Sequence, residues 1–301
     1  MIFRPTSLLS TAIVAMLAAT SAAHADTRLQ ASSGAQYSNG DYGDTTSTSA
    51  LVVPFSVRAS FGSWSIRASV PYITADGTAN LSELIDDHGG SSGSGSGSSS
   101  SSGSGSSGSG SSGSGSGGSG SGDSDDDDDD VVTTNNRTAS GIGDATLAMT
   151  YSFDDIANSA AYLDLTGRAR FPTGSESDGL SVGTTDYFVV TELGWDGDAA
   201  GVFVSGGRRF LGNSDNTDRV DGWQASFGGW LNLAETVVVG AYYDWRNSSV
   251  RGGEDPSSVD AYIAWRMNNA WKIEFNGGVG LSDASADYTA GVTLIWRSGS
   301  F

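Results

Sequence analysis

Apolar and polar side chains alternate with a period of two along most of the chain, a pattern typical of half-buried β-strands. In residues 271–281, Trp271, Ile273 and Phe275 occupy one register and Lys272 occupies the other. The same alternation is clear in residues 161–171, 237–246 and 259–267, and weaker in runs that begin near Leu29, Leu51, Trp64, Ala145, Tyr187, Val202, Trp223 and Tyr288. Together the runs predict about twelve strands. Each has roughly ten residues, the length that crosses a bilayer at a tilt of about 45°.

The connections between these predicted strands alternate between short and long. The short ones are Gly62–Ser63, Asp154–Asn158, Asp196–Asp198, Ala234–Glu235 and Asn268–Ala270. The long ones are Gly40–Asp44, Ile73–Ile142, Pro172–Asp186, Gly212–Val220, Asn247–Ser257 and Ser282–Asp287. Short turns at one end and long loops at the other are typical of a bacterial outer-membrane barrel whose chain ends both lie in the periplasm. We therefore expect an all-β fold, a transmembrane antiparallel β-barrel, rather than a soluble β-sandwich.

Aromatic and charged residues favour the same fold. Large aromatics stand beside predicted turns, as in the girdles of membrane barrels, namely Trp64, Tyr151, Phe153, Trp195, Trp245, Trp265, Trp271 and Trp296. The face of the strands assigned to lipid is nearly free of charge, and a charged side chain there at mid-bilayer costs about 2–4 kcal/mol. The opposite face supplies the candidate lumen-lining residues Arg58, Arg67, Asp164, Arg168, Arg170, Glu192, Asp244, Arg246, Asp260, Arg266 and Glu274. Barrels between about eight and sixteen strands lie between filled and open, so a narrow or partly plugged lumen is expected.

One segment departs from the alternation. Ser91–Gly122 is almost entirely Ser and Gly, and Asp123–Asp130 adds seven aspartates. Such a composition cannot bury apolar surface and is expected to be disordered. We interpret it as a low-complexity insertion, over residues 78–139, in a long extracellular loop.

The first residues predict export. Arg4 precedes an apolar run over residues 8–19, and Ala23-His24-Ala25 supplies the small residues of a cleavage site. The alternative, an N-terminal helical anchor, needs about 20 apolar residues. We therefore expect a signal peptide over 1–25, cleaved after Ala25, and a barrel over 26–301 in the outer membrane.

The composition of the chain limits the kinds of partner that we expect it to bind. The net charge of −20 argues against nucleic acid, whose binding requires a basic surface. The chain has no cysteine, so an exported form depends on its strand ladder and its packing rather than on disulfides. The expected partners are outer-membrane lipid, small-molecule solutes and, during export, the barrel-assembly machinery.

Four Gly-rich stretches carry a family resemblance: Ser38–Asp44, Ser69–Ile73, Ser140–Leu147 and Phe171–Tyr187. In these stretches the chain resembles the transporter-like outer-membrane barrels labelled "MetA-pathway of phenol degradation". Within the last stretch Leu180, Gly183 and Asp186 fit the family pattern, whereas Ser181 and Val182 replace the usual Gly-Thr. The resemblance implies a twelve-strand outer-membrane barrel that passes small molecules, often aromatic or hydrophobic. It implies no particular binding residue.

The sequence offers little for catalysis, and we expect no enzyme and no cofactor. The histidines are His24, in the predicted signal, and His88, beside the low-complexity tract, so a Ser-His-Asp triad on the wall is not available. A Ser-Lys pair would need Lys272, near a predicted turn, and the lumen carboxylates are interleaved with arginines. Weak cation binding at the aspartates Asp125, Asp126, Asp127, Asp128, Asp129 and Asp130 is a further option, against a solvated acidic spacer.

Two functions remain open. The first is passive passage of small molecules, with Arg58, Arg67, Arg168, Arg170, Arg209, Arg246 and Arg266 either forming an anion-selective ring or neutralising lumen carboxylates. The second is a structural or surface-interaction barrel whose acidic outer loop contacts partners or cations.

Overall fold

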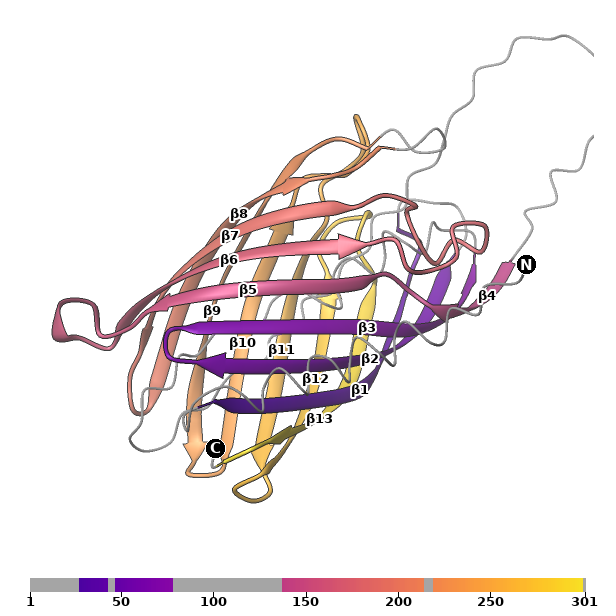
Figure 1. Cartoon of the computed structure of the whole chain (residues 1–301). Coiled ribbons are helices and arrows are strands. Elements are labelled where there is room, and N and C mark those ends of the chain that lie inside the picture. Colours follow the sequence, from indigo (N-terminus) through magenta and orange to yellow (C-terminus); the bar gives the residue numbers. More distant parts are fainter. Residues whose placement is uncertain (1–26, 43–46, 78–136, 214–218, 300–301) are drawn as a thin grey trace, which may run out of the picture.

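The computed structural model describes residues 27–42, 47–77, 137–213 and 219–299 (Figure 1). The predicted signal peptide over 1–25, the Ser/Gly/Asp tract with Asp125–Asp130, and both histidines lie outside these described residues. No helix among the described residues is long and apolar enough to span a membrane.

The described chain forms thirteen antiparallel strands and a single-turn 3-10 helix, Ile156–Asn158, between β5 and β6. The strands are β1 Arg28–Gly40, β2 Thr48–Phe61, β3 Trp64–Gly77, β4 Arg137–Ile142, β5 Ala145–Phe153, β6 Ala161–Phe171, β7 Asp186–Asp196, β8 Ala200–Phe210, β9 Gly222–Ala234, β10 Val237–Arg246, β11 Ser257–Arg266, β12 Trp271–Gly280 and β13 Tyr288–Arg297.

The sheet closes into a twelve-stranded barrel, which confirms the predicted fold (Figure 1). Neighbouring strands pair with each other, and β1 pairs with both β2 and β13, so the ends of the sheet meet. Strands β4 and β5 count as one strand of the barrel because both pair with β3. Closure gives every strand except β4 a paired neighbour on each side, so that the wall of the barrel has no free edge, as a bilayer requires.

The division between β4 and β5 is a bulge in the wall. The β3–β4 pairing reaches Ile142 and the β3–β5 pairing resumes at Thr146, while the backbone N–H of Gly143 donates to the carbonyl of Pro71 at 2.9 Å. A Cβ on Gly143 would lie less than 3.0 Å from the end of the Ile73 side chain, which would have to move to admit a larger residue here. A bulge redirects the neighbouring side chain, and Asp144 accordingly points inward and is buried.

Strand β4 begins at Arg137, and β3 continues to Gly77. The wall therefore extends at both edges into the connection predicted over Ile73–Ile142, and it includes the last three residues of the segment 78–139. These extensions lie at the end of the barrel that carries the long connections, which we call the long-loop end. The opposite end, with the short turns, is the short-turn end.

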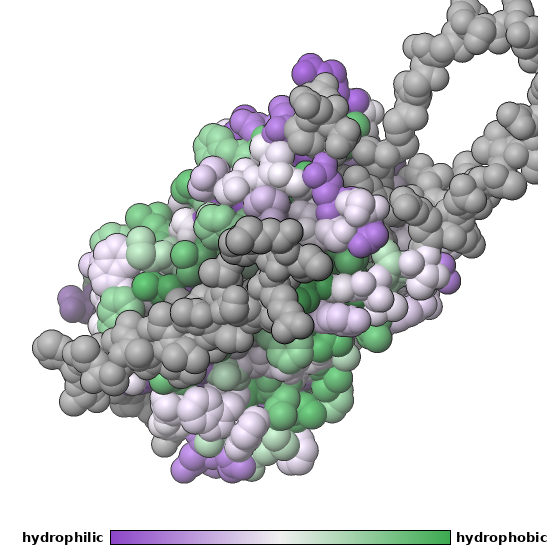
Figure 2. Space-filling model, turned by 45° about the vertical axis from the view of Figure 1, so that its right-hand side comes forward, coloured by the Kyte–Doolittle hydropathy of each residue, from purple (hydrophilic) through white to green (hydrophobic). Residues whose placement is uncertain are grey.

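The outward-facing side of the barrel wall is apolar, as predicted. Its side chains include Val189, Leu193, Val202, Phe227 and Leu233, each more than half exposed in the absence of lipid. Figure 2 shows hydrophobic residues, in green, over parts of the visible wall. Among the described strands, the charged residues on this register are Asp76 and Arg208, both at the long-loop end. A charged side chain costs little near the interface and much at mid-bilayer, so these positions agree with a lipid-facing wall.

Inside the barrel, three aromatic rings lie close to glycines on the neighbouring strand. Tyr162 pairs with Gly194, Trp230 with Gly201, and Tyr262 with Gly240. A Cβ on any of these glycines would lie less than 3.0 Å from a ring atom of its aromatic partner. The glycines thus let bulky side chains pack against the wall.

We predict that Gly240→Val destabilises the barrel by about 1–3 kcal/mol, because the new side chain forces the Tyr262 ring off the wall. The matched control is Gly167→Val on the outward register of β6, where a Cβ meets nothing within 4 Å. Urea unfolding of the two variants in lipid vesicles provides the comparison. Equal midpoints for Gly240→Val and Gly167→Val would contradict the packing described here.

Candidate functional site: the lumen and its long-loop end

The structure places all eleven candidate lumen residues on the inward-facing register. Asp164, Arg170, Arg246, Asp260 and Glu274 are buried, and the remaining six, Arg58, Arg67, Arg168, Glu192, Asp244 and Arg266, are partly exposed. They do not form a single ring around the lumen, because some lie toward the short-turn end of the barrel and others toward the long-loop end.

Several lumen carboxylates have close polar partners. The Tyr162 hydroxyl donates to Glu192 Oε1 at 2.8 Å. The Ser258 hydroxyl donates to Asp260 Oδ2 at 2.7 Å. Lys272 Nζ lies 3.7 Å from Glu274 Oε2. Such partners offset the cost of taking a carboxylate out of water, so these groups contribute to the packing of the barrel interior.

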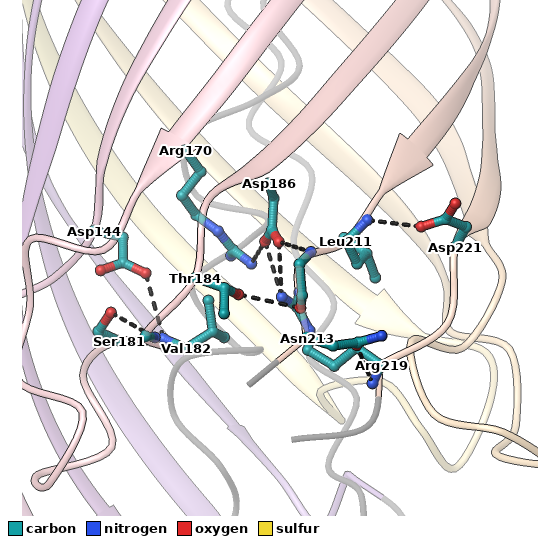
Figure 3. Close-up of polar contacts among 12 residues, drawn as sticks. Asp144, Arg170, Ser181, Val182, Thr184, Asp186, Leu211, Asn213, Arg219 and Asp221 are labelled. Atoms are coloured by element: carbon teal, nitrogen blue, oxygen red, sulfur yellow. Dashed lines mark hydrogen bonds and ion pairs between the residues drawn. The ribbon is translucent and has the colours of Figure 1, made fainter. Parts of the chain in front are cut away.

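The most connected carboxylate is Asp186, the first residue of β7. It is fully buried, at 0 % exposure. Arg219 Nη1 donates to both carboxylate oxygens at 2.9 and 3.0 Å, Arg170 Nη2 donates to Oδ2, and the Gly212 backbone N–H donates to Oδ1 at 2.7 Å (Figure 3). One carboxylate thus ties together the end of β6, the start of β7 and the connection between β8 and β9.

A second carboxylate, Asp144 of the bulge, holds the connection over residues 172–185, which we call the mouth loop. Asp144 Oδ1 accepts from the Gly174 backbone N–H at 3.2 Å and Oδ2 accepts from the Val182 N–H at 3.4 Å. Thr173 donates from its hydroxyl to the Gly143 carbonyl at 3.0 Å and accepts from the Ala145 N–H at 2.8 Å. Both ends of the mouth loop are therefore fastened to the bulge. Asp144 and Asp186 are together called the latch carboxylates.

The fastened mouth loop places Leu180, at 2 % exposure, in an apolar cluster inside the long-loop end. Its buried members are Tyr42, Ala50, Val52, Ile73, Ala75, Ala139, Leu180 and Ala286. A Cβ on Gly141 would come within 2.8 Å of the Leu180 side chain, so glycine makes room for it. Burial raises the pKa of the Tyr42 hydroxyl to about 12, so Tyr42 is neutral and compatible with this apolar cluster.

The latch carboxylates were not among the candidate lumen residues. Asp144, Leu180 and Asp186 stood out in the sequence only because they belong to the stretches that carry the family resemblance. Arg219 lies in the connection between β8 and β9 and had no sequence signal. Two of the resembling stretches have a clear role in the structure, since Ser140–Leu147 contains the bulge and Phe171–Tyr187 contains the mouth loop.

These groups can bind a solute and hold the mouth loop in place. In the part of the chain that the structure describes, no three Asp, Glu or His side chains gather in a way that would hold a metal ion. The inward-facing polar groups include arginines, hydroxyls and carboxylates, which can attract or repel a solute.

At the level of sequence, the chain matches no protein-family profile and no characterised protein. Among solved structures it is similar to the COG4313 outer membrane channel from Pseudomonas putida F1, with a TM-score of 0.57 and 12 % identity over 92 % of this chain and 97 % of that one. This likeness shows the fold. The KdgM porin, with a TM-score of 0.45 and 8 % identity over 90 % of this chain and 99 % of that one, is too distant to support an argument.

We predict that Asp186→Asn destabilises the barrel by about 3–5 kcal/mol, because it leaves Arg170 and Arg219 buried without their shared negative charge. Asp283→Asn, at an exposed position of another connection at the same end, should leave the urea midpoint unchanged. Unfolding of both variants in lipid vesicles tests this, and a wild-type midpoint for Asp186→Asn would show that the charge does not stabilise the fold.

Proposed function

We propose that this protein is an outer-membrane barrel for the passive passage of small solutes, with the mouth loop restricting the opening. The observation that carries the proposal is the strict division of the wall, with an apolar lipid-facing register and an arginine-rich, hydroxyl-rich interior. A purely structural barrel has no need for so many partly exposed charges inside. The similarity in fold to a protein described as an outer membrane channel is consistent with this function.

The proposal includes the orientation and processing of the chain. The signal peptide over 1–25 is removed after Ala25, and the barrel over 26–301 is inserted in outer-membrane lipid by the barrel-assembly machinery. The short-turn end faces the periplasm, and the long-loop end, with the segment 78–139, faces outward.

The finer substrate class follows only from the resemblance to the "MetA-pathway of phenol degradation" barrels, whose members pass small aromatic or hydrophobic molecules. Support for that family comes from the role of the resembling stretches, because Ser140–Leu147 and Phe171–Tyr187 together form the bulge and the mouth loop. We place the chain among such barrels as part of the proposal.

The alternative is a surface-interaction barrel that acts through its acidic outer loop. Deleting Ser91–Asp130 separates the two functions. A passage barrel should keep its conductance after the deletion, whereas a surface-interaction barrel should lose binding of whole cells to a partner or to Ca²⁺ while the conductance is unaffected.

We predict that Asp144→Ala increases the single-channel conductance in planar bilayers. The substitution removes the acceptor for the Gly174 and Val182 N–H groups, each of which then loses a hydrogen bond whose absence costs about 1–3 kcal/mol when the group is buried. The mouth loop should therefore leave the opening more often. Asp283→Ala, an exposed aspartate on a different connection, is the control and should conduct like wild type.

Two results would count against the proposal. One is a barrel that stays sealed both as wild type and as Asp144→Ala, although its migration on gels shows that it is folded. The other is an equal rise in conductance for Asp283→Ala, which would remove the mouth loop as the cause.

A further inference from the structure

The cross-strand register aligns five inward-facing arginines in one row. Starting at β13, Arg297 pairs with Gln30, Gln30 with Arg58, and Arg58 with Arg67. The row continues through Ala148 to Arg168 and through Phe188 to Arg209 on β8. We call Arg297, Arg58, Arg67, Arg168 and Arg209 the arginine track.

The track climbs from one end of the barrel to the other. Arg297 is the last residue of β13, at the short-turn end, and Arg209 is the second-last residue of β8, at the long-loop end. A row of paired residues runs perpendicular to the strands, and strands tilt by about 35–45° in membrane barrels. Seven steps of about 4.8 Å between strands therefore raise the row by roughly 20 Å, close to the height of the apolar band, about 25 Å.

Hydroxyl groups flank the track on both sides. Two positions along each strand toward the short-turn end, the row reads Ser60, Ser65, Thr150 and Thr166. Two positions toward the long-loop end, it reads Ser32, Ser56, Ser69 and Thr146. These hydroxyls pair among themselves, as between Ser69 and Thr146 at 2.6 Å, and Arg58 Nη2 donates to Ser65 Oγ at 3.0 Å. The guanidinium groups on β2 and β3 thus have hydroxyl neighbours, and the flanking row continues from Thr146 to the ion pair of Arg170 and Asp186.

Nearby contacts hold the upper part of the track in place. The Arg168 guanidinium lies over the Phe188 ring, 3.8 Å from its centre. Arg209 Nη1 donates to the Asn247 carbonyl at 2.9 Å. Both contacts help to fix the position of these guanidinium groups.

Four of the five track arginines, Arg58, Arg67, Arg168 and Arg297, are partly exposed, and Arg209 is buried. Among the inward carboxylates, Asp164, Asp186, Asp260 and Glu274 are at most 2 % exposed, whereas Glu192 and Asp244 are partly exposed. The carboxylates Asp164, Glu192 and Asp244 form a row of their own, continued by Ser205 and Ser226. On β6 this row lies four residues from the arginine track, and the ion pair of Arg170 with Asp186 lies in the next inward row on the other side of the track.

We infer that the arginine track is a path for small organic carboxylates through the barrel. A planar guanidinium binds a carboxylate through two parallel hydrogen bonds, and neighbouring hydroxyls supply further donors. A row of such sites lets an anion move from one to the next without losing its partners at any step, as successive weak sites do in selective pores. This inference rests on the proposed function and names the solute class for it.

The test measures reversal potentials in planar bilayers across a gradient of potassium acetate, with Asp144→Ala present in every variant to open the mouth. The parent should prefer acetate over potassium. Arg67→Gln and Arg168→Gln should each lower the acetate-to-potassium permeability ratio by about fivefold, the effect of one unit charge at 4 Å in water. Arg208→Gln, which removes an arginine from the lipid-facing register beside the track, should leave the ratio unchanged.

A parent that prefers potassium, or a ratio that is the same in the Gln variants, would overturn the inference and leave the proposed passage function standing. If no variant conducts, passage itself fails, and binding then decides the role of the track. Saturation-transfer NMR of benzoate with the detergent-solubilised barrel should show contact in wild type and none in the Arg67→Gln/Arg168→Gln double variant. No benzoate contact with wild type would overturn the track as a carboxylate site.

Discussion

The requirement that every backbone polar group find a partner inside the bilayer governs the rest of this structure. Only closure of the sheet meets it for a β-protein, and β1 meets it by pairing with β13 and β2. Closure in turn fixes the cross-strand register around the whole wall. Residues far apart in sequence, such as Arg297 and Arg58, therefore become next-but-one neighbours in a single row. The arginine track is a consequence of the same pairing that makes the wall stable in lipid.

The bulge at Gly143–Asp144 is where the wall departs from this regular pairing. A residue left out of the ladder releases Asp144 from the alternation and turns its carboxylate toward the interior, where two backbone N–H groups of the mouth loop reach it. These N–H groups are not part of any strand, so they need an acceptor. The bulge and the mouth loop therefore depend on each other, which explains why the two resembling stretches occur together in this sequence.

The sequence predicted the strands well because period-two alternation reports directly on a wall with lipid on one side. All twelve predicted runs correspond to strands, including residues 202–211, where Arg208 and Phe210 share the outward register. Arg208 is tolerated because it lies at the long-loop end with its guanidinium 5.0 Å from the centre of the Trp223 ring. The inward fold of the mouth loop was not predictable, since Leu180 sits among Gly, Ser and Thr with no periodicity. The arginine track was not predictable either, because it depends on register between strands, which alternation within one strand does not reveal.

The whole chain has a net negative charge, whereas its described inward-facing side chains have a small net positive charge. The sequence carries 35 acidic and 15 basic residues. Among the inward-facing side chains of the strands that the structure describes, ten are basic, Arg28, Arg58, Arg67, Arg168, Arg170, Arg209, Arg246, Arg266, Lys272 and Arg297, and seven are acidic, Asp164, Asp186, Glu192, Asp196, Asp244, Asp260 and Glu274. At physiological ionic strength exposed charges are screened beyond about 8 Å. On the proposed path, acidic residues far from the lumen would therefore repel an anion only weakly, and the free energy of the anion would depend on the inward charges close to it. The net charge of the chain thus bears on how a solute approaches the barrel, and the inward charges bear on the proposed path through it.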